Sequence, residues 1–436
     1  LHLGIENPLI DKQIIDTSHE TTEFCALPGG KGGKFKYPKL EELHDKLFGY
    51  KFDEAHNAAA DVEATTRIFF KTLEQKIITR PDISIDSNIM NYLDDIKSDI
   101  LKTVDTRKVI NVDDSLDHNT KSDNLNRLRD VDFSHLQIHS QFSVLQSTVA
   151  IKALIKKAAE QKNQAVSITD LGNMFGAFHF VKEVFAHNKD VDAFNAKIES
   201  GEINETPKSK LKGIVGCEFF VCKDHKNKDY KDNGYQVVFL AKNKSGYHNL
   251  AKLCSIAHTE GSYYVPRIDK VLVEKYKNDL IVLTGSLQGE IPYLILNVGE
   301  KQAEEAFQWW HNLFGDDFYV SLQRHGLEEE DVVNKTLIQF AQKYGVKVVA
   351  ANNVFYLNKS DAQAHDILLC VKEGELVSTP IGRGRGYRYG FPNNEFYYKS
   401  QDEMKSLFAD IPEAIENISL VLNKIENYKL ERDVLL

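Results

Sequence analysis

Four polar residues at or near the ends of apolar, strand-like segments could form a metal site. They are His139 in HLQIHS, Asp170 in TDLGN, Glu218 in IVGCEFFV and His325 in SLQRHG. Glu218 lies inside its apolar segment, where a carboxylate without a partner is costly to bury. Imidazole and carboxylate groups suit divalent ions such as Mn²⁺, Mg²⁺ or Zn²⁺. If these segments are strands of one barrel, their loops gather at one end and bring the four side chains together.

A second candidate is the segment HNAAAD, which contains His56 and Asp61. Side chains five residues apart on one helix point about 140° away from each other. They converge only if His56 lies just before the helix, with Asn57 near its cap. That arrangement would place a proton acceptor and a metal-binding carboxylate at one helix start. The alternative is a solvated His and Asp at an ordinary helix cap.

A third candidate is the basic glycine loop GRGRGYRYG at 382–390, which carries Arg383, Arg385 and Arg388. It does not match GxGxxG and lacks the Lys-Ser/Thr pair of a P-loop. Two interpretations remain open for this loop. It contacts phosphates in a DNA channel, or it is a solvated loop.

Apolar segments and amphipathic helices follow one another between residues 131 and 357. The expected strands are 165–169, 214–222, 236–241, 280–284, 318–322 and 346–351. Apolar residues at helical spacing predict helices over 151–159, 303–314 and 333–344. Apolar strands separated by helices indicate an α/β fold with a mostly parallel sheet, and the length suits a (βα) barrel.

The rest of the chain divides around this barrel. Residues 1–80 contain a helix with apolar positions at Val62, Thr65, Phe69 and Leu73. Residues 81–130 are rich in Asp, Asn, Ser and Lys and are predicted to be a polar linker with weak helices. Residues 358–436 contain the glycine loop and then two helices, the second beginning near Pro412.

Composition narrows the function further. The 436 residues include 54 Lys and Arg against 64 Asp and Glu, a formal charge of −10, so nucleic-acid contact would require a local basic patch. The five cysteines form no CxxC, which favours a reducing cytoplasm over a disulfide framework. No apolar stretch reaches the length of a membrane span, so we expect no membrane partner.

Residues 131–436 resemble the N-terminal part of the alpha subunits of bacterial replicative DNA polymerase III. The matching segments include HLQIHSQFS, TDLGNMFGAFHF, IVGCEFFV, FLAKNKSGYHNL, SLQRHGL and VVAANNVFY. The resemblance implies a PHP domain (polymerase and histidinol phosphatase) with a distorted, TIM-like (βα) barrel. It also implies that 358–436 leads towards the polymerase palm, onto which the glycine loop could dock. Metal-competent members of the family bind up to three ions through a cluster of His, Asp and Glu.

Five positions depart from that ligand cluster. Gln137 and Leu171 stand where the family has His, Gln236 replaces a His before a strand, and Asn353 and Phe355 replace a closing Asp-x-His. The four residues named first remain. We therefore expect a degenerate site with little or no hydrolysis, whose polar residues hydrogen-bond one another. Binding of a PHP metal, Zn²⁺ or Mn²⁺, is in question for the same reason.

Residues 1–75 resemble the C-terminal part of proofreading 3′–5′ exonucleases, which have a ribonuclease-H-like fold. The likeness covers the GGKGGKF turn, the ELHDKLFG helix and HNAAAD. It implies that His56 takes a proton from a metal-bound water, and that Asp61 helps to hold two Mg²⁺ or Mn²⁺ ions. The Asp-x-Glu strand of that family would precede this motif, and residues 1–55 contain no DxE.

Together the two resemblances imply a bacterial DNA polymerase with a fused proofreading exonuclease. Such a protein uses Mg²⁺ or Mn²⁺, primer–template DNA and deoxynucleoside triphosphates, and works with replisome components such as the sliding clamp. The sequence opens with Leu1 inside an apolar segment, so we expect a fragment that holds neither complete active site and serves as a scaffold. Two alternatives remain: a stand-alone PHP-type metal-dependent phosphoesterase, and an interaction module that recruits replisome partners.

Overall fold

The computed structural model describes residues 16–29, 34–50, 58–78, 118–382, 384 and 386–430. The chain divides into two compact units, Leu1–Ile110 and Asn111–Leu436. In the first unit the described helices are α1 (Thr17–Glu20), α2 (Thr22–Cys25), α3 (Leu40–Phe48) and α4 (Ala58–Glu74). They enclose a small core of Cys25, Leu43 and Ile68.

The helix expected in the first unit is confirmed as α4, and of its expected apolar positions Leu73 is buried and Phe69 half-buried. Ala64 and Ile68 are buried, whereas Thr65 is exposed. The reason is that α4 packs against α3, and this neighbour decides which helical positions are covered.

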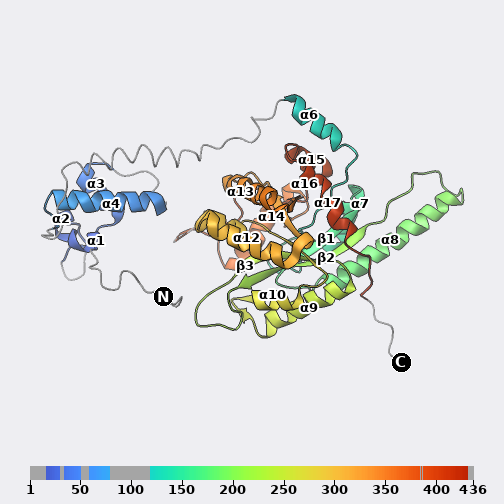
Figure 1. Ribbon diagram of the computed structural model, residues 1–436, viewed down its shortest axis with the longest axis horizontal. Helices are drawn as coiled ribbons and strands as arrows, with labels where there is room; N and C mark the ends of the chain where they lie inside the picture. The colour runs from blue at the N-terminus through green and yellow to red at the C-terminus, as the bar shows by residue number, and fades with distance from the viewer. Residues whose placement is uncertain are drawn as a thin grey trace. The chain divides into compact units, whose positions relative to one another are not determined.

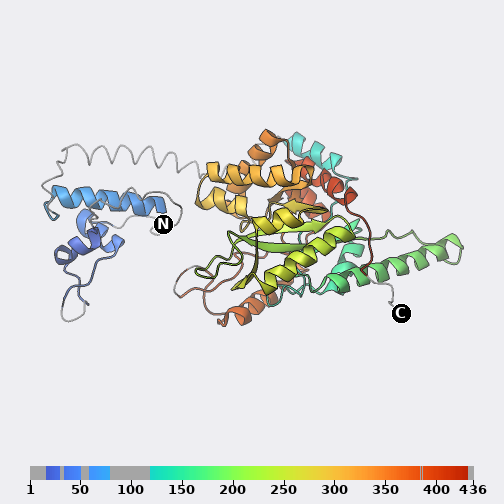
Figure 2. The same ribbon diagram turned by 60° about the horizontal axis from the view of Figure 1, so that its bottom comes forward.

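The second unit is built on an eight-stranded sheet in the order β4-β5-β2-β3-β6-β7-β8, with β1 paired to β2. The strands are β1 (Ala165–Leu171), β2 (Lys212–Cys222), β3 (Tyr235–Ala241), β4 (Ser262–Tyr263), β5 (Val265–Asp269), β6 (Leu280–Leu283), β7 (Phe318–Gln323) and β8 (Lys347–Ala351). All six expected strands are present. The sheet curls into a half-barrel, in agreement with a distorted TIM-like α/β fold (Figures 1 and 2).

The sheet is mixed rather than mostly parallel. β3 runs antiparallel to both β2 and β6, while β1–β2, β2–β5, β6–β7 and β7–β8 are parallel. The connection from β2 to β3 spans only residues 223–234, without a helix. Parallel neighbours are usually joined by a crossover helix, so this short loop without a helix agrees with the antiparallel pairing.

Helices cover the sheet and extend it. They are α6 (His118–Arg127), α7 (Ile151–Glu160), α8 (Ala177–Glu199), α9 (Lys244–Thr259), α10 (Lys270–Tyr276), α11 (Glu290–Asn297), α12 (Glu300–Phe314), α13 (Glu328–Tyr344), α14 (Ala362–Glu373), α15 (Gln401–Leu407), α16 (Pro412–Glu416) and α17 (Ile418–Asn423), with short 3₁₀ turns at Gly315–Asp317 and Lys359–Asp361. α9 packs on β2, β3 and β5, and α12 and α13 pack on β7. α8 projects well beyond the sheet in both views (Figures 1 and 2).

The main core lies between the sheet and these helices. Every residue of β1 is buried, and the largest enclosed side chains include Trp310, Phe239 and Phe307. α6 is held on the same unit, because the Asn124 side-chain amide donates to the Ala409 carbonyl at 2.8 Å. The last part of the predicted linker is therefore an ordered helix. None of the described helices combines the length and apolar character needed to cross a bilayer.

Candidate functional site

The fold buries all four predicted PHP residues, together called the Glu218 layer below, and joins two of them, His139 and Glu218, by a direct contact. The pairing of Asp170 with Cys217 and of Leu171 with Glu218 places the Asp170 and Glu218 side chains on opposite faces of the sheet. Glu218 lies in the middle of β2, opposite Val238 of β3 and beside Leu171 of β1. Asp170 lies near the end of β1, and His325 follows β7 directly. His139 lies in the extended segment before α7, next to a bridge between Ile138 and Val354. All four side chains are almost completely enclosed.

Glu218 is the centre of a hydrogen-bonded network. Its Oε2 lies 2.8 Å from His139 Nε2 and accepts from Gln137 Nε2, also at 2.8 Å. Gln137 Oε1 in turn accepts from Gln323 Nε2 at 2.9 Å. The His139 ring stacks on Phe355 with centroids 4.1 Å apart. Of the four residues predicted to hydrogen-bond one another, only His139 and Glu218 do so, and Gln137 and Gln323 complete their network.

Asp170 is bound by its own set of donors. Oδ1 accepts from the Ser140 backbone N–H and the Ser143 hydroxyl, both at 2.7 Å. Oδ2 accepts from the Ser140 hydroxyl at 2.8 Å. Burial raises the pKa of Asp170, and the hydrogen bonds from Ser143 and Ser140 oppose this rise. Both carboxylate oxygens are therefore occupied within the protein.

His325 is likewise occupied at both ring nitrogens. Nδ1 lies 2.6 Å from Glu330 Oε1, and Nε2 accepts the Asn353 backbone N–H at 3.2 Å. A ring that accepts at Nε2 and donates at Nδ1 is the neutral Nδ1–H tautomer, which has no lone pair left for an ion. The ring also stacks on Phe396 at 4.2 Å.

These contacts decide whether a metal fits here. Two oxygens of the layer, Glu218 Oε1 and Asn353 Oδ1, have no hydrogen-bond partner among the described residues. The other ligand atoms of His139, Asp170 and His325 are engaged with neighbours. Within the described ranges, no cluster of three or more His, Cys, Asp or Glu ligand atoms forms at this layer. The residues as placed do not fit a metal centre.

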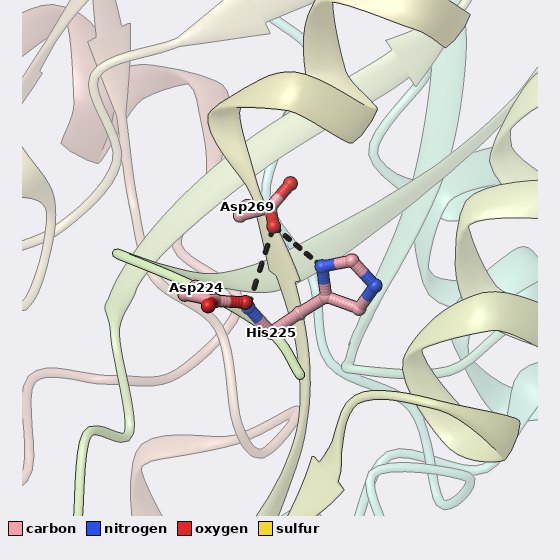
Figure 3. A group of neighbouring side chains, drawn as sticks. All are labelled: Asp224, His225 and Asp269. Carbon is pink, nitrogen blue, oxygen red and sulfur yellow. Dashed lines mark hydrogen bonds and ion pairs between the residues drawn. The ribbon is translucent and has the colours of Figure 1, made fainter. Parts of the chain in front are cut away.

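One such cluster does occur in the described chain, at Asp224, His225 and Asp269 (Figure 3). Asp269 Oδ2 accepts from His225 Nδ1 at 2.5 Å and from the His225 backbone N–H at 3.3 Å. Asp269 Oδ1 caps α10 by accepting from Leu272 N–H at 3.0 Å.

That cluster is better explained as a hydrogen-bonded pair. Two ligands of one Zn²⁺ ion, each at about 2.0–2.2 Å, lie roughly 3 Å apart, so the His225–Asp269 separation leaves room for a proton but not for an ion. Burial would raise the pKa of Asp269, but hydrogen bonds from His225 and Leu272 hold it below its ordinary value. Asp224 is exposed and bonds only the nearby Lys226 N–H. The pair fixes the β2–β3 loop to the start of α10.

The remaining predicted residues lie partly outside the described chain. His56, Arg383 and Arg385 are outside the described residues, and Asp61 belongs to α4 but its side chain is not described. Arg388 is described and buried, with its guanidinium bound to both oxygens of Asp366 at 2.7 Å. Its strongest donors are therefore used within the chain.

The sequence analysis missed several partners that complete the layer. Gln323 and Gln137 are 186 residues apart, and no local pattern joins them. Glu330 was detectable in principle, because it lies five residues after His325 in an acidic first turn of α13. Ser140 and Ser143 lie just after His139 and were not singled out.

Comparison with known proteins identifies the domain that holds these residues. Residues 135–325 match the family model of the PHP domain. The DNA polymerase III subunit alpha of Borreliella burgdorferi is 37% identical over 302 residues, which cover 68% of this chain and 24% of that protein. The subunits of Treponema pallidum and Thermus aquaticus are each 35% identical over 65% of this chain, and 22% and 21% of their own lengths are covered.

The chain thus spans about a quarter of the length of these relatives, or less. A crystal structure from Bifidobacterium adolescentis, named as a metal-dependent phosphoesterase, aligns over 51% of this chain and 87% of that chain. The alignment has a TM-score of 0.31 and 11% identity, which is too weak a likeness to carry an argument.

Proposed function

Because residues 135–325 of this chain are a PHP domain, we propose that the chain is the PHP region of a bacterial replicative DNA polymerase, where it acts as a scaffold and accessory domain. The observation that carries this proposal is the network on Glu218, in which His139 and Gln137 bind one carboxylate oxygen instead of a metal. The similarity to DNA polymerase III alpha subunits over about two thirds of the chain supplies the context.

The activity to which the chain contributes is template-directed DNA synthesis. Its substrates are primer–template DNA and deoxynucleoside triphosphates with Mg²⁺ or Mn²⁺, and the sliding clamp is among its partners in the bacterial cytoplasm. Residues 1–80 belong to a proofreading exonuclease, with His56 and Asp61 at its metal site. The chain by itself neither extends a primer nor digests a 3′ end.

A PHP domain suggests metal use, yet the donor set here argues for a structural layer. Metal-assisted hydrolysis requires an ion that activates a water, held by ligands with free lone pairs. In this layer His325 Nε2 accepts from the Asn353 N–H, and Asp170 accepts three hydrogen bonds from Ser140 and Ser143, which leaves few lone pairs for an ion. The replaced positions therefore agree with a site that stabilises the barrel by hydrogen bonding.

The test measures metal content and hydrolysis together. The purified chain is dialysed against Zn²⁺ or Mn²⁺, then analysed by mass spectrometry of metals and assayed with p-nitrophenyl phosphate. We expect well under one ion per chain and no turnover. One or more ions per chain, with turnover that Glu218→Gln abolishes, would instead establish the stand-alone phosphoesterase.

A matched variant makes a negative result meaningful. Restoring the family ligands with Gln137→His, Leu171→His, Gln236→His, Asn353→Asp and Phe355→His supplies the missing donors. This variant should gain bound metal while circular dichroism shows a retained fold. Primer-extension and 3′-digestion assays on the unchanged chain complete the set, and extension of a primer would contradict the scaffold role.

A further inference from the structure

A lysine-lined groove lies between α8, the start of β2 and the segment around the end of α17. Its cavity measures about 750 Å³. Five lysines and one aspartate line it: Lys182, Lys189, Lys210, Lys212, Lys429 and Asp192. The remaining polar lining consists of amides, including Asn423 and Asn427.

Two of the lysines build the groove. Lys212 Nζ donates to the carbonyl oxygens of Leu422 and Ile425, at 2.7 and 2.8 Å, and so fixes the segment after α17 as one wall. Lys210 Nζ lies 2.9 Å from a carboxylate oxygen of Asp192 on α8. These contacts hold the walls in place before any ligand is present.

The other three lysines have no such partner. Within the described residues, Lys182, Lys189 and Lys429 form no ion pair or hydrogen bond, and Lys429 only lies over the Phe185 ring at 5.5 Å. All three are exposed at the mouth of the groove. Three unneutralised cations beside two structural lysines form a positive patch on a chain whose formal charge is −10. Such a patch attracts a polyanion.

We propose that this groove binds the phosphate backbone of DNA through Lys182, Lys189 and Lys429. The choice of DNA over an acidic polypeptide rests on the proposed function in DNA synthesis. Ammonium groups on flexible stems contact phosphates as point charges, and amides supply further donors without reading sequence. Binding in the groove should therefore be independent of base sequence and should weaken with salt.

The test compares two charge-reversal variants of the full chain. The first carries Lys182→Glu, Lys189→Glu and Lys429→Glu. The control carries Lys244→Glu, Lys301→Glu and Lys335→Glu, which are exposed on α9, α12 and α13. Both variants have the same net charge, so a difference between them reports position. Thermal unfolding verifies that both remain folded.

Binding is measured by fluorescence anisotropy with labelled 20-nucleotide single strands and duplexes of two unrelated sequences. We expect the groove variant to bind at least tenfold more weakly than the control. The slope of log affinity against log salt should fall by about 2, the value for roughly three phosphate contacts on a single strand. Equal binding by the two variants would overturn the proposal, as would competition by polyglutamate as effective as that by unlabelled DNA.

This readout is separate from the test of the proposed function. Anisotropy requires no metal, hydrolysis or primer extension. If the chain bound metal and hydrolysed p-nitrophenyl phosphate, the scaffold role would fail, but the measured DNA affinity of the groove would stand. If the two variants bound DNA equally, the groove proposal would fail, but the hydrogen bonds on Glu218 would be unaffected.

Discussion

The Glu218 layer and the lysine groove both contain charged side chains on or near β2, but the layer buries its carboxylate and the groove exposes its lysines. In the layer, the carboxylate of Glu218 is enclosed and bound by His139 and Gln137. In the groove, Lys182, Lys189 and Lys429 remain exposed and form no ion pair among the described residues, although Asp192 belongs to the same lining. Buried charge has to be satisfied within the chain, whereas exposed charge is free to act on a ligand. We therefore expect the residues that resemble a catalytic site to contribute to stability, and the exposed surface lysines to be available for binding.

The largest effect should follow from breaking the layer at its centre. Glu218→Ala leaves the His139 ring and the Gln137 amide buried without their acceptor. Removal of one partner from a buried pair costs about 3–5 kcal/mol in free energy of unfolding. Urea unfolding measures this loss, with the exposed Glu205→Ala as control. A cost below about 1 kcal/mol would show that the layer does not stabilise the barrel.

A second effect should appear as a pH dependence of stability. Burial lowers the pKa of His135 from 6.5 to about 4, while a hydrogen bond to the Lys399 carbonyl opposes this shift. The unfolded chain binds the proton more tightly, so this group's contribution to stability is present above about pH 6.5 and is lost as pH falls towards 4. The loss amounts to about 3 kcal/mol.

The measurement is the free energy of unfolding across that window in the wild type and in His135→Gln. We expect the difference between the two proteins to change most between pH 4 and 6.5. Parallel curves would mean that His135 does not supply the slope.

A smaller effect is expected where charge pairs are exposed. Arg127 of α6 binds Glu416 at 2.6 Å and Glu413 at 3.2 Å, and its side chain is 45% exposed. Exposed pairs contribute about 0.2–1 kcal/mol. Arg127→Ala should therefore modestly increase the rate of amide hydrogen exchange in α6, and Lys335→Ala serves as the control. An unchanged exchange rate would indicate that the other contacts of α6 hold it in place.

The smallest effect on stability should come from the groove itself. The double variant Lys189→Ala and Lys429→Ala removes no ion pair in the described chain, and such surface changes stay within about 0.5 kcal/mol. Urea unfolding checks this value. A larger loss would place these lysines among the structural groups and would remove the contrast with the Glu218 layer.

Several elements were predictable because their patterns are local. Each of these patterns can be recognised within a single segment of the sequence. Examples are the apolar runs of β1, β2 and β7, and the buried face of α7 formed by Ile151, Leu154, Ile155 and Ala158. Strands β4 and β5 were not predicted, because they are short and Pro266 within β5 is unusual inside a strand. The antiparallel direction of β3 was missed too, because an apolar strand has the same pattern in either direction.

Residue types and spacing alone determined that this chain holds an α/β barrel with an enclosed polar layer, because burying Glu218 and His139 in apolar segments requires partners. The identity of those partners, and of the groups that stay free, depends on tertiary packing. Contacts such as Gln323 to Gln137, or Lys212 to Leu422, join residues about 200 positions apart. Their existence depends on how strands and helices pack, and this packing closes the layer on itself while it leaves the groove open to a ligand.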